Sequence, residues 1–177
     1  SKEGHNGSFT WQMHKADETK DPAEKISQPG YQTGKWMPAI VPGTVLNSLV
    51  HNKMYPEPYY GMNNKLDRNI IPDLAKTGRE FYTYWFRTEF DVPENYKDKI
   101  VWLQVDGINY RAEIWVNGYL LGNMSGMFKP EYINITDFAR IGQKNALAIK
   151  GLSGRYAGNH QPKQWGADRR VSQWWRR

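Results

Sequence analysis

Apolar and polar residues alternate with a period of two in the second half of the chain. In the first such stretch, Tyr84, Phe86 and Phe90 would lie on one face of a strand, with Trp85 on the other. The same alternation recurs over residues 101–105, 111–116, 133–135 and 147–149. A period of two is what an extended strand with one buried face produces. The pattern therefore predicts a series of short β-strands.

Two local signals predict a hairpin and a helix. Asn117-Gly118 separates two alternating stretches, and both residues accept the positive φ angles of a type I′ turn. Thr44 can cap a short helix that ends near Asn52. The apolar stripe of that helix comprises Val45, Leu46, Leu49 and Val50. At about two turns, such a helix must be held by packing rather than by intrinsic propensity.

Short strands, frequent turn signals and one short helix are typical of an antiparallel β-sandwich. We therefore expect an all-β protein with a single sandwich domain over residues 1–177. Residues 1–8 would form a ragged N-terminus, and residues 152–177, where the alternation dissolves, an irregular and truncated C-terminal segment. Residues 15–35 and 55–73 are interrupted by Pro and Gly, which predicts irregular surface segments.

Composition and charge narrow the function classes. The 8 Trp, 11 Tyr and 6 Phe favour a β-rich protein with rings near its surface. The chain has no Cys, which excludes disulfides, thiolate metal sites and Cys nucleophiles. The net charge of +6 leaves a polyanion or nucleic-acid binder through the basic, Trp-rich C-terminus as one alternative. Elsewhere both signs interleave, as on an ordinary solvated surface, so neither nucleic acid nor membrane is the expected partner.

Five stretches of this chain, in this order, resemble the N-terminal domain of family 2 glycoside hydrolases. They are VPGTVLNSLV (41–50), YPEPYYGMN (55–63), YWFRTEFDVP (84–93), VWLQVDGINYRAEIWVNGYLLG (101–122) and NALAIKG (145–151). That family includes β-galactosidases, β-glucuronidases, β-mannosidases and exo-β-glucosaminidases. YPEPYYGMN and DGINYRAEIWVNG are most similar to the exo-β-glucosaminidase and β-mannosidase side of the family.

The resemblance implies a jelly-roll sandwich of the galactose-binding-domain-like type. In such enzymes an immunoglobulin-like sandwich and a barrel with two catalytic Glu follow, and this chain stops before both. No catalytic residue is therefore assigned, and the chain alone is expected to be inactive. The implied function is a non-catalytic domain of a larger retaining exo-β-glycosidase, which shapes or supports the active site of the barrel. The implied partners are those downstream domains and a β-linked oligosaccharide or glycoside, and the implied location is periplasmic or secreted.

Two segments contain candidates for contact with substrate in the full enzyme. Tyr59, Tyr60 and Asn63 belong to a loop fixed by prolines, and by similarity it would reach towards the outermost sugar subsite. His160 and Trp165, in the C-terminal segment, are candidates for the same role. The alternative for the loop is an ordinary packed surface turn.

A second set of candidates is aromatic. Trp85, Trp102 and Trp115 fall opposite the apolar alternation of their strands, so we expect them to share one face. They would form a sugar-stacking platform there, or else a buried layer or a domain interface. Glu89 and Glu113 also lie opposite the apolar alternation, where solvated positions are expected.

Other catalytic and ligand-binding chemistry has no support in the sequence. The four His share no metal-ligand spacing, and no glycine loop joins a strand to a helix in the manner of a phosphate site. Neither a metal nor a cofactor is therefore expected. The remaining alternative to the enzyme-domain interpretation, ahead of the polyanion binder, is an autonomous carbohydrate-binding module.

Overall fold

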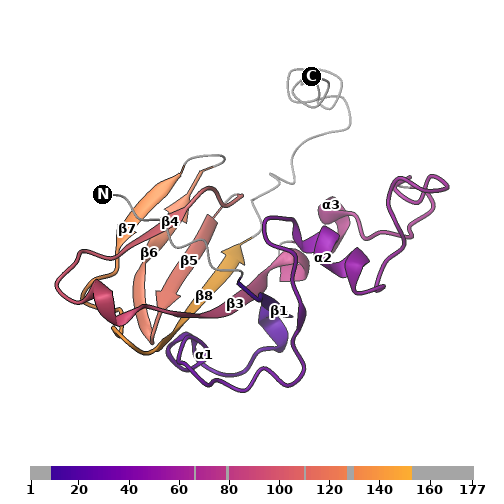
Figure 1. The fold of residues 1–177 in the computed structure, drawn as a ribbon. Coiled ribbons are helices and arrows are strands. Elements are labelled where there is room, and N and C mark those ends of the chain that lie inside the picture. The colour runs from indigo at the N-terminus through magenta and orange to yellow at the C-terminus, as the bar shows by residue number, and fades with distance from the viewer. Residues whose placement is uncertain (1–8, 66, 79, 110, 127–129, 153–177) are drawn as a thin grey trace.

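The computed structural model describes residues 9–65, 67–78, 80–109, 111–126 and 130–152, and within them the chain is mostly strand (Figure 1). A six-stranded sheet has the order β2-β1-β3-β8-β5-β6, and a smaller sheet pairs β4 with β7. All of these neighbouring strands run antiparallel. The expected all-β sandwich is thus confirmed.

The strands have the following bounds. They are β1 (Gln12–Lys15), β2 (Met37–Pro38), β3 (Tyr84–Asp91), β4 (Trp102–Val105), β5 (Arg111–Val116), β6 (Tyr119–Ser125), β7 (Glu131–Asn134) and β8 (Lys144–Leu152). The α-helices are α1 (Ala23–Ile26), α2 (Val45–His51) and α3 (Leu74–Thr77), and the 3-10 turns are η1 (Ala16–Glu18), η2 (Glu80–Tyr82) and η3 (Glu94–Tyr96). All of the helices lie in connections between strands, and none in the described part of the chain is long and apolar enough to cross a membrane.

The local signals of the sequence produce the predicted elements. Asn117 has φ 51° and Gly118 has φ 93°, and they join β5 to β6. The Thr44 hydroxyl accepts a hydrogen bond from the backbone N–H of Asn47 at 3.0 Å, which caps α2. The described residues between 55 and 73 form turns and bends without regular structure, as predicted. α1 and α3 are single turns that the apolar pattern did not indicate.

The main core lies between the two sheets. Ile114, Val116 and Leu147 point from the large sheet towards Leu103 and Ile133 of the small one. Ile114 and Val116 are fully buried. The alternation along each strand therefore places its apolar face in this core and leaves the other face for a different neighbour.

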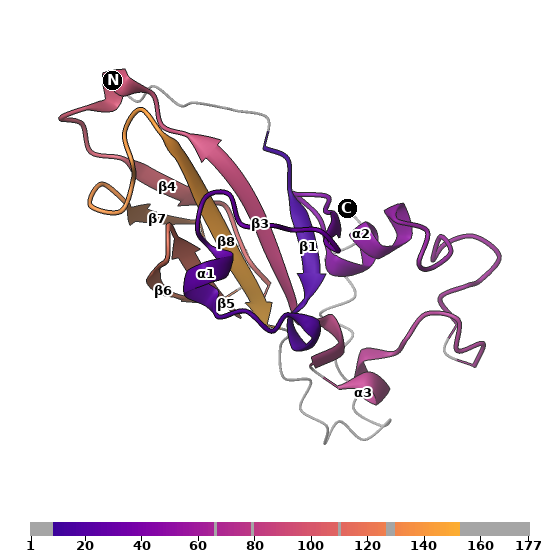
Figure 2. The same cartoon turned by 90° about the horizontal axis from the view of Figure 1, so that it is seen from below.

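The second face of the large sheet is covered by the segment between β1 and β2. Figure 2, seen from below, shows α1 lying across β8 and β5. Ile26 of α1 is fully buried against Trp85 and Ala148. Residues 15–35 were expected to form an irregular surface segment, and that expectation is only partly correct. The reason is that Trp85 and Trp115 create an apolar patch on this face, which requires a cover.

An ion pair between buried Arg87 and half-buried Glu89 holds this cover in place. Arg87 is 5% exposed, and its Nε donates to the Ile26 carbonyl at 2.9 Å. Its Nη2 donates to the Gln28 carbonyl at 2.8 Å and to Glu89 Oε1 at 2.6 Å. The backbone N–H of Gly30 also donates to Glu89 Oε1, at 2.8 Å. Glu89 was expected at a solvated position, but it is instead the half-buried partner of Arg87.

The charge of Glu89 is stabilised by these partners. Burial acts to raise the pKa of Glu89, but the hydrogen bonds from Arg87 and Gly30 outweigh it, so the pKa lies below its usual value. The ionised Glu89 side chain therefore helps to hold the segment between β1 and β2 against the sheet.

Candidate functional site

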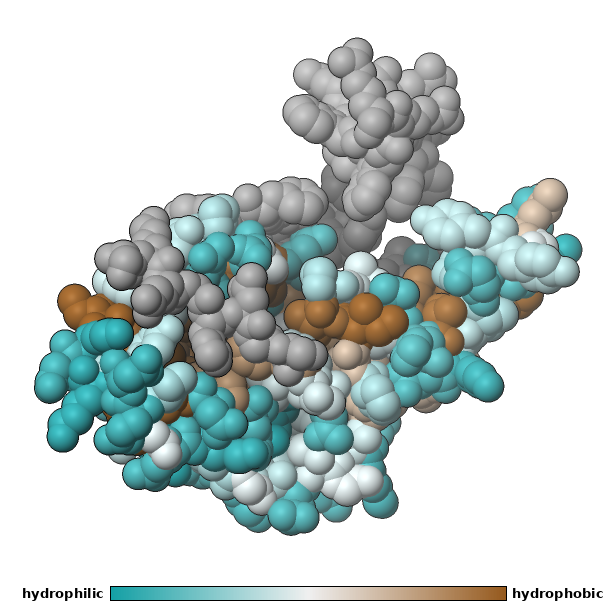
Figure 3. All heavy atoms as spheres, viewed as in Figure 1, coloured by the Kyte–Doolittle hydropathy of each residue, from teal (hydrophilic) through white to brown (hydrophobic). Residues whose placement is uncertain are grey.

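A groove opens between the sandwich and the α2 segment, with a volume of about 1490 Å³. Figure 3 shows apolar side chains at the surface between these two parts of the molecule. Its walls are formed by described residues of three regions: residues 41–46 at the start of α2, then Pro58, Asn64 and residues 71–73, and finally residues 105–109 with Arg111, where β4 ends and β5 begins. It is thus built from segments far apart in the sequence.

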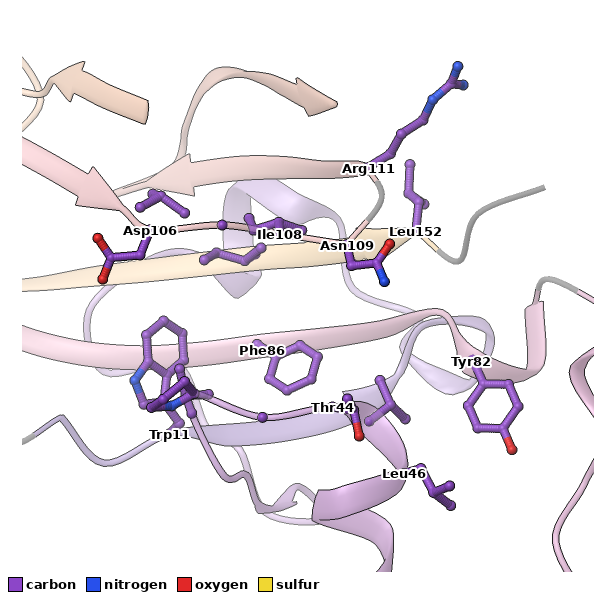
Figure 4. A pocket seen from close by; sticks show the side chains of 18 of the residues that line it. Trp11, Thr44, Leu46, Tyr82, Phe86, Asp106, Ile108, Asn109, Arg111 and Leu152 are labelled. Carbon is purple, nitrogen blue, oxygen red and sulfur yellow. The ribbon is translucent and has the colours of Figure 1, made fainter. Parts of the chain in front are cut away.

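The floor of the groove is a part of the large sheet that the described small sheet does not reach. β3 and β8 are 8 and 9 residues long, whereas β4 and β7 have 4 residues each. Phe86 and Ile149 are cross-strand partners, and both line the groove. Trp11 and Ile108 line it as well, and Figure 4 shows them with Phe86. Within the described part of the chain, the inner face of the large sheet therefore extends beyond the small sheet and lines the groove.

The rim of the groove is more polar than its floor. Asp106, Asn109 and Arg111 stand on one side, and Thr44 at the start of α2 stands on the other (Figure 4). The Arg111 side chain points away from the floor in this view. An apolar floor with polar groups at one edge suits a ring-bearing ligand or an apolar polypeptide segment.

The loop that carries Tyr59, Tyr60 and Asn63 forms the outer end of this site. Tyr59 is 88% exposed and Tyr60 is 78% exposed. Asn63 Nδ2 donates to the Glu57 carbonyl at 2.9 Å, and the backbone N–H of Asn64 donates to the Pro58 carbonyl at 3.1 Å. Pro58 and Asn64 line the groove. The loop thus presents two exposed rings from a hydrogen-bonded frame next to the groove.

The three tryptophans do not share a face, and that expectation is wrong. Trp85 is 4% exposed and lies beneath α1, and Trp115 packs in the same cluster. Trp102 lies in the small sheet and is 54% exposed. Alternation fixes the face of a residue within its own strand, but it does not say to which sheet that strand belongs. His160 and Trp165 lie outside the described residues.

Sequence reasoning missed the groove floor and the role of Arg87. Trp11 precedes β1, whereas Phe86 lies on β3 and Ile149 on β8, and only the tertiary structure brings them together. The role of Arg87 could not be identified from the sequence, because its partners are backbone carbonyls of a distant segment. Among the described residues, no group of three or more acidic, His or Cys side chains could hold a metal.

Comparison with known proteins agrees with this architecture. Residues 11–176 match the family described as "Glycosyl hydrolase 2 galactose-binding domain-like". A mannosylglycoprotein endo-β-mannosidase of Lilium longiflorum is 40% identical over 121 residues, which are 68% of this chain and 12% of the relative. An exo-β-D-glucosaminidase of Streptomyces avermitilis is 28% identical over 134 residues, which are 73% of this chain and 14% of the relative. The chain thus spans about an eighth of the length of these relatives.

Solved structures show the same fold. The crystal structure of an Amycolatopsis orientalis exo-chitosanase aligns with a TM-score of 0.67 and 24% identity, over 81% of this chain and 16% of that one. A family 2 glycosyl hydrolase from Bacteroides cellulosilyticus aligns with a TM-score of 0.51 and 22% identity, over 80% of this chain and 16% of that one. The family match covers well over half of the sequence, and the observed sandwich agrees with it. The chain therefore belongs to the glycosyl hydrolase 2 galactose-binding domain-like family.

Proposed function

We propose that this chain is a non-catalytic N-terminal sandwich domain of a larger retaining exo-β-glycosidase. One observation carries the proposal: the family match extends over residues 11–176, yet the chain spans only 12–14% of the length of its relatives. The domain would shape or support the active site of a barrel domain of the same polypeptide. The reaction would be double displacement through a glycosyl-enzyme intermediate, with both carboxylates supplied by that barrel.

Glu89 and Glu113, the two acidic strand residues considered above, are consistent with a non-catalytic role for this domain. A retaining glycosidase needs two carboxyl groups about 5–5.5 Å apart, one of them with a raised pKa to act as the acid. Glu89 is held by Arg87 and Gly30, and its pKa is lowered rather than raised. Glu113 Oε2 lies 3.5 Å from the Trp115 indole nitrogen, on the face beneath the cover. Neither residue is arranged as a catalytic acid.

The groove and its loop are the parts of this domain best placed to shape a neighbouring active site. Tyr59 and Tyr60 would contact the sugar or wall its pocket, with Asn63 holding the loop from within. We extend the same role to His160 and Trp165 of the C-terminal segment. The partners would then be an immunoglobulin-like sandwich and a barrel of the same polypeptide, in a periplasmic or secreted enzyme.

The substrate class follows from what the relatives share. One relative is named as an endo-β-mannosidase and another as an exo-β-D-glucosaminidase, so a β-linked glycoside is common to both. Action at the chain end follows the glucosaminidase, whereas the Lilium enzyme is named for internal cleavage. We propose a β-glycoside substrate and exo action.

Activity measurements with the chain and with a longer polypeptide test the proposal. The source gene is sequenced beyond the codon for Arg177, and both products are assayed with aryl β-mannoside and aryl β-glucosaminide. Turnover is expected only from the longer product. Turnover by the purified 177-residue chain, or a stop codon directly after Arg177, would refute the accessory role.

A matched pair of variants in the longer polypeptide tests the role of the loop. Tyr60→Ala should raise KM by about tenfold if the ring contacts substrate. Tyr119→Ala is the control, because Tyr119 is also an exposed tyrosine, at 58%, but lies on β6. Equal kinetic effects of the two substitutions would contradict a substrate contact by the loop.

A further inference from the structure

The outer face of the small sheet is built from two rings and two amides. Trp102 is paired with Asn134 across the ladder, and Gln104 is paired with Tyr132. Trp102 is 54% and Tyr132 is 58% exposed, and both amide residues are exposed as well. Leu103 and Ile133, between them in sequence, point into the core. These four outward side chains are called here the β4–β7 face. A ring and an amide follow one another along each strand and also lie opposite one another across the ladder.

Each amide of this face is fixed in one orientation. Gln104 Nε2 donates to Asp106 Oδ1 at 2.7 Å, and an ionised carboxylate can only accept. Gln104 Oε1 is therefore the outward acceptor. Asn134 Oδ1 accepts from the backbone N–H of Thr136 at 3.0 Å and from its hydroxyl at 2.6 Å. Because a backbone N–H can only donate, Asn134 Nδ2 is the outward donor.

One amide donor, one amide acceptor and two aromatic rings suit the chemistry of a sugar. Each sugar hydroxyl both donates and accepts, so it can use either amide. The C–H faces of a pyranose are apolar and can pack on indole or phenol rings, which present a flat apolar surface with a polar edge. Small-molecule sites commonly combine aromatic walls with a few placed polar groups in this way.

The lack of charged side chains on the β4–β7 face favours a neutral ligand over a polyanion. None of its four outward side chains is ionised at neutral pH, although the chain as a whole carries a net charge of +6. Asp106, at the edge of the face, is engaged by Gln104. A polyanion would need Lys or Arg here, whereas a neutral ligand does not.

We propose that the β4–β7 face is a binding site for neutral oligosaccharides, and the choice of β-linked ones rests on the proposed function. Trp102 and Tyr132 provide the stacking surfaces, and Gln104 and Asn134 provide the hydrogen bonds. Asp106 and Thr136 are positioning residues, because they act only through the two amides. The site would give this chain affinity for a glycan by itself, which goes beyond the proposed role of supporting a barrel.

An NMR titration of the full 177-residue chain tests the site. The probes are cellotetraose and β-1,4-mannotetraose, with dextran sulfate as the polyanionic comparison. The Trp102 indole N–H signal, assigned with Trp102→Phe, should shift saturably with a dissociation constant on the order of 1 mM. Once the signal is assigned, the titration itself uses only the unaltered chain.

Variants then locate the binding. Trp102→Ala and Tyr132→Ala should each weaken binding by about tenfold, and Trp102→Phe should restore part of the loss because it keeps a ring. Tyr119→Ala is the matched control, since Tyr119 and Tyr132 are both 58% exposed. Asp106→Ala should cause a smaller loss, because it releases the amide of Gln104 without removing it.

Several results would overturn the proposal. One is the absence of a saturable shift with either oligosaccharide, and another is equal weakening by Tyr119→Ala. Binding of dextran sulfate alone, abolished by salt, would indicate a polyanion site instead. Protection of Trp102 from oxidation in a longer polypeptide without sugar would show that another domain covers the face. None of these results bears on glycosidase activity, so this proposal and the accessory role can fail separately.

Discussion

At the scale of single residues, this domain depends on buried polar groups with complete hydrogen bonding. Every buried side-chain nitrogen or oxygen among the described residues has a partner. Asn117 Nδ2 donates to Asn145 Oδ1 at 2.7 Å, and Asn117 Oδ1 accepts from the backbone N–H of Ala146 at 2.9 Å. Such buried groups lower the stability of the fold little while they are hydrogen-bonded, but removal of one partner lowers it strongly.

Arg87→Met should therefore destabilise the fold more than any surface charge change. It leaves the carbonyls of Ile26 and Gln28 and the carboxylate of Glu89 without their donor, at an expected cost of about 2–4 kcal/mol. Urea unfolding followed by circular dichroism measures this cost. Lys144→Met is the control, because its pair with Glu89 is long, at 4.0 Å, and exposed, so about 0.5 kcal/mol or less is expected. Similar losses in both variants would contradict this role of Arg87.

The raised pKa of Tyr84 predicts how the free energy of unfolding changes at high pH. Burial, reinforced by the neighbouring Tyr55 and acidic groups, raises the pKa of Tyr84 from 10.0 to about 12. The folded state thus holds this proton more tightly than the unfolded state. The contribution of Tyr84 to stability should be constant up to about pH 10 and should fall as the pH rises through about 12, by about 3 kcal/mol in total.

Denaturant unfolding at a series of alkaline pH values measures this dependence. Tyr84→Phe should flatten it, although Tyr31 and Tyr82, whose pKa values burial also raises, would leave a smaller slope. Absorbance at 295 nm gives an independent check, because one tyrosine should ionise after the others. Simultaneous ionisation of all tyrosines near their usual pKa would rule this account out.

At the scale of elements, the sequence predicted the strands well but, apart from one hairpin, did not predict their pairing. The alternation in Trp102–Val105 gave the correct inward and outward faces of β4. It could not show that β4 pairs with β7 in a separate sheet, because the period of a strand carries no information about its neighbour. The hairpin at Asn117-Gly118 was predictable, since its signal lies in the turn residues themselves.

Gly118→Ala should test how strongly that turn constrains the sheet. Gly118 has φ 93°, which an L-residue with a Cβ rarely adopts, and an added Cβ would also displace the Gln28 side chain. The expected loss is about 1–2 kcal/mol in the free energy of unfolding. Thermal or urea unfolding provides the measurement.

Gly34→Ala supplies the matched control for the turn substitution. No atom lies within 4 Å of a Cβ at Gly34, so the change should be neutral or slightly stabilising. If Gly118→Ala proved as harmless as Gly34→Ala, the left-handed backbone at the turn would not be the constraint.

At the scale of the whole molecule, unequal layers explain both the core and the candidate site. The large sheet is covered by the α1 segment on one face and by the small sheet on part of the other. The groove occupies what the small sheet leaves open, over Phe86 and Ile149. Sequence reasoning could not locate it, because its position depends on relative strand lengths and on three converging connections. Only the exposed loop with Tyr59 and Tyr60 could be identified beforehand.

The two layers should unfold as one cooperative unit, which also tests the single-domain expectation. Leu103 packs into both clusters between the sheets, whereas Gln104, next to it on β4, is exposed. Leu103→Ala should lower stability by about 2–3 kcal/mol, and Gln104→Ala should change it by about 0.5 kcal/mol or less. Far-ultraviolet circular dichroism and tryptophan fluorescence should give coincident transitions in all variants, because rings occur in both sheets. Separate transitions after Leu103→Ala would mean that the small sheet folds independently of the six-stranded one. A domain with one shared core cannot behave in that way, since loss of the contact between its layers destabilises both.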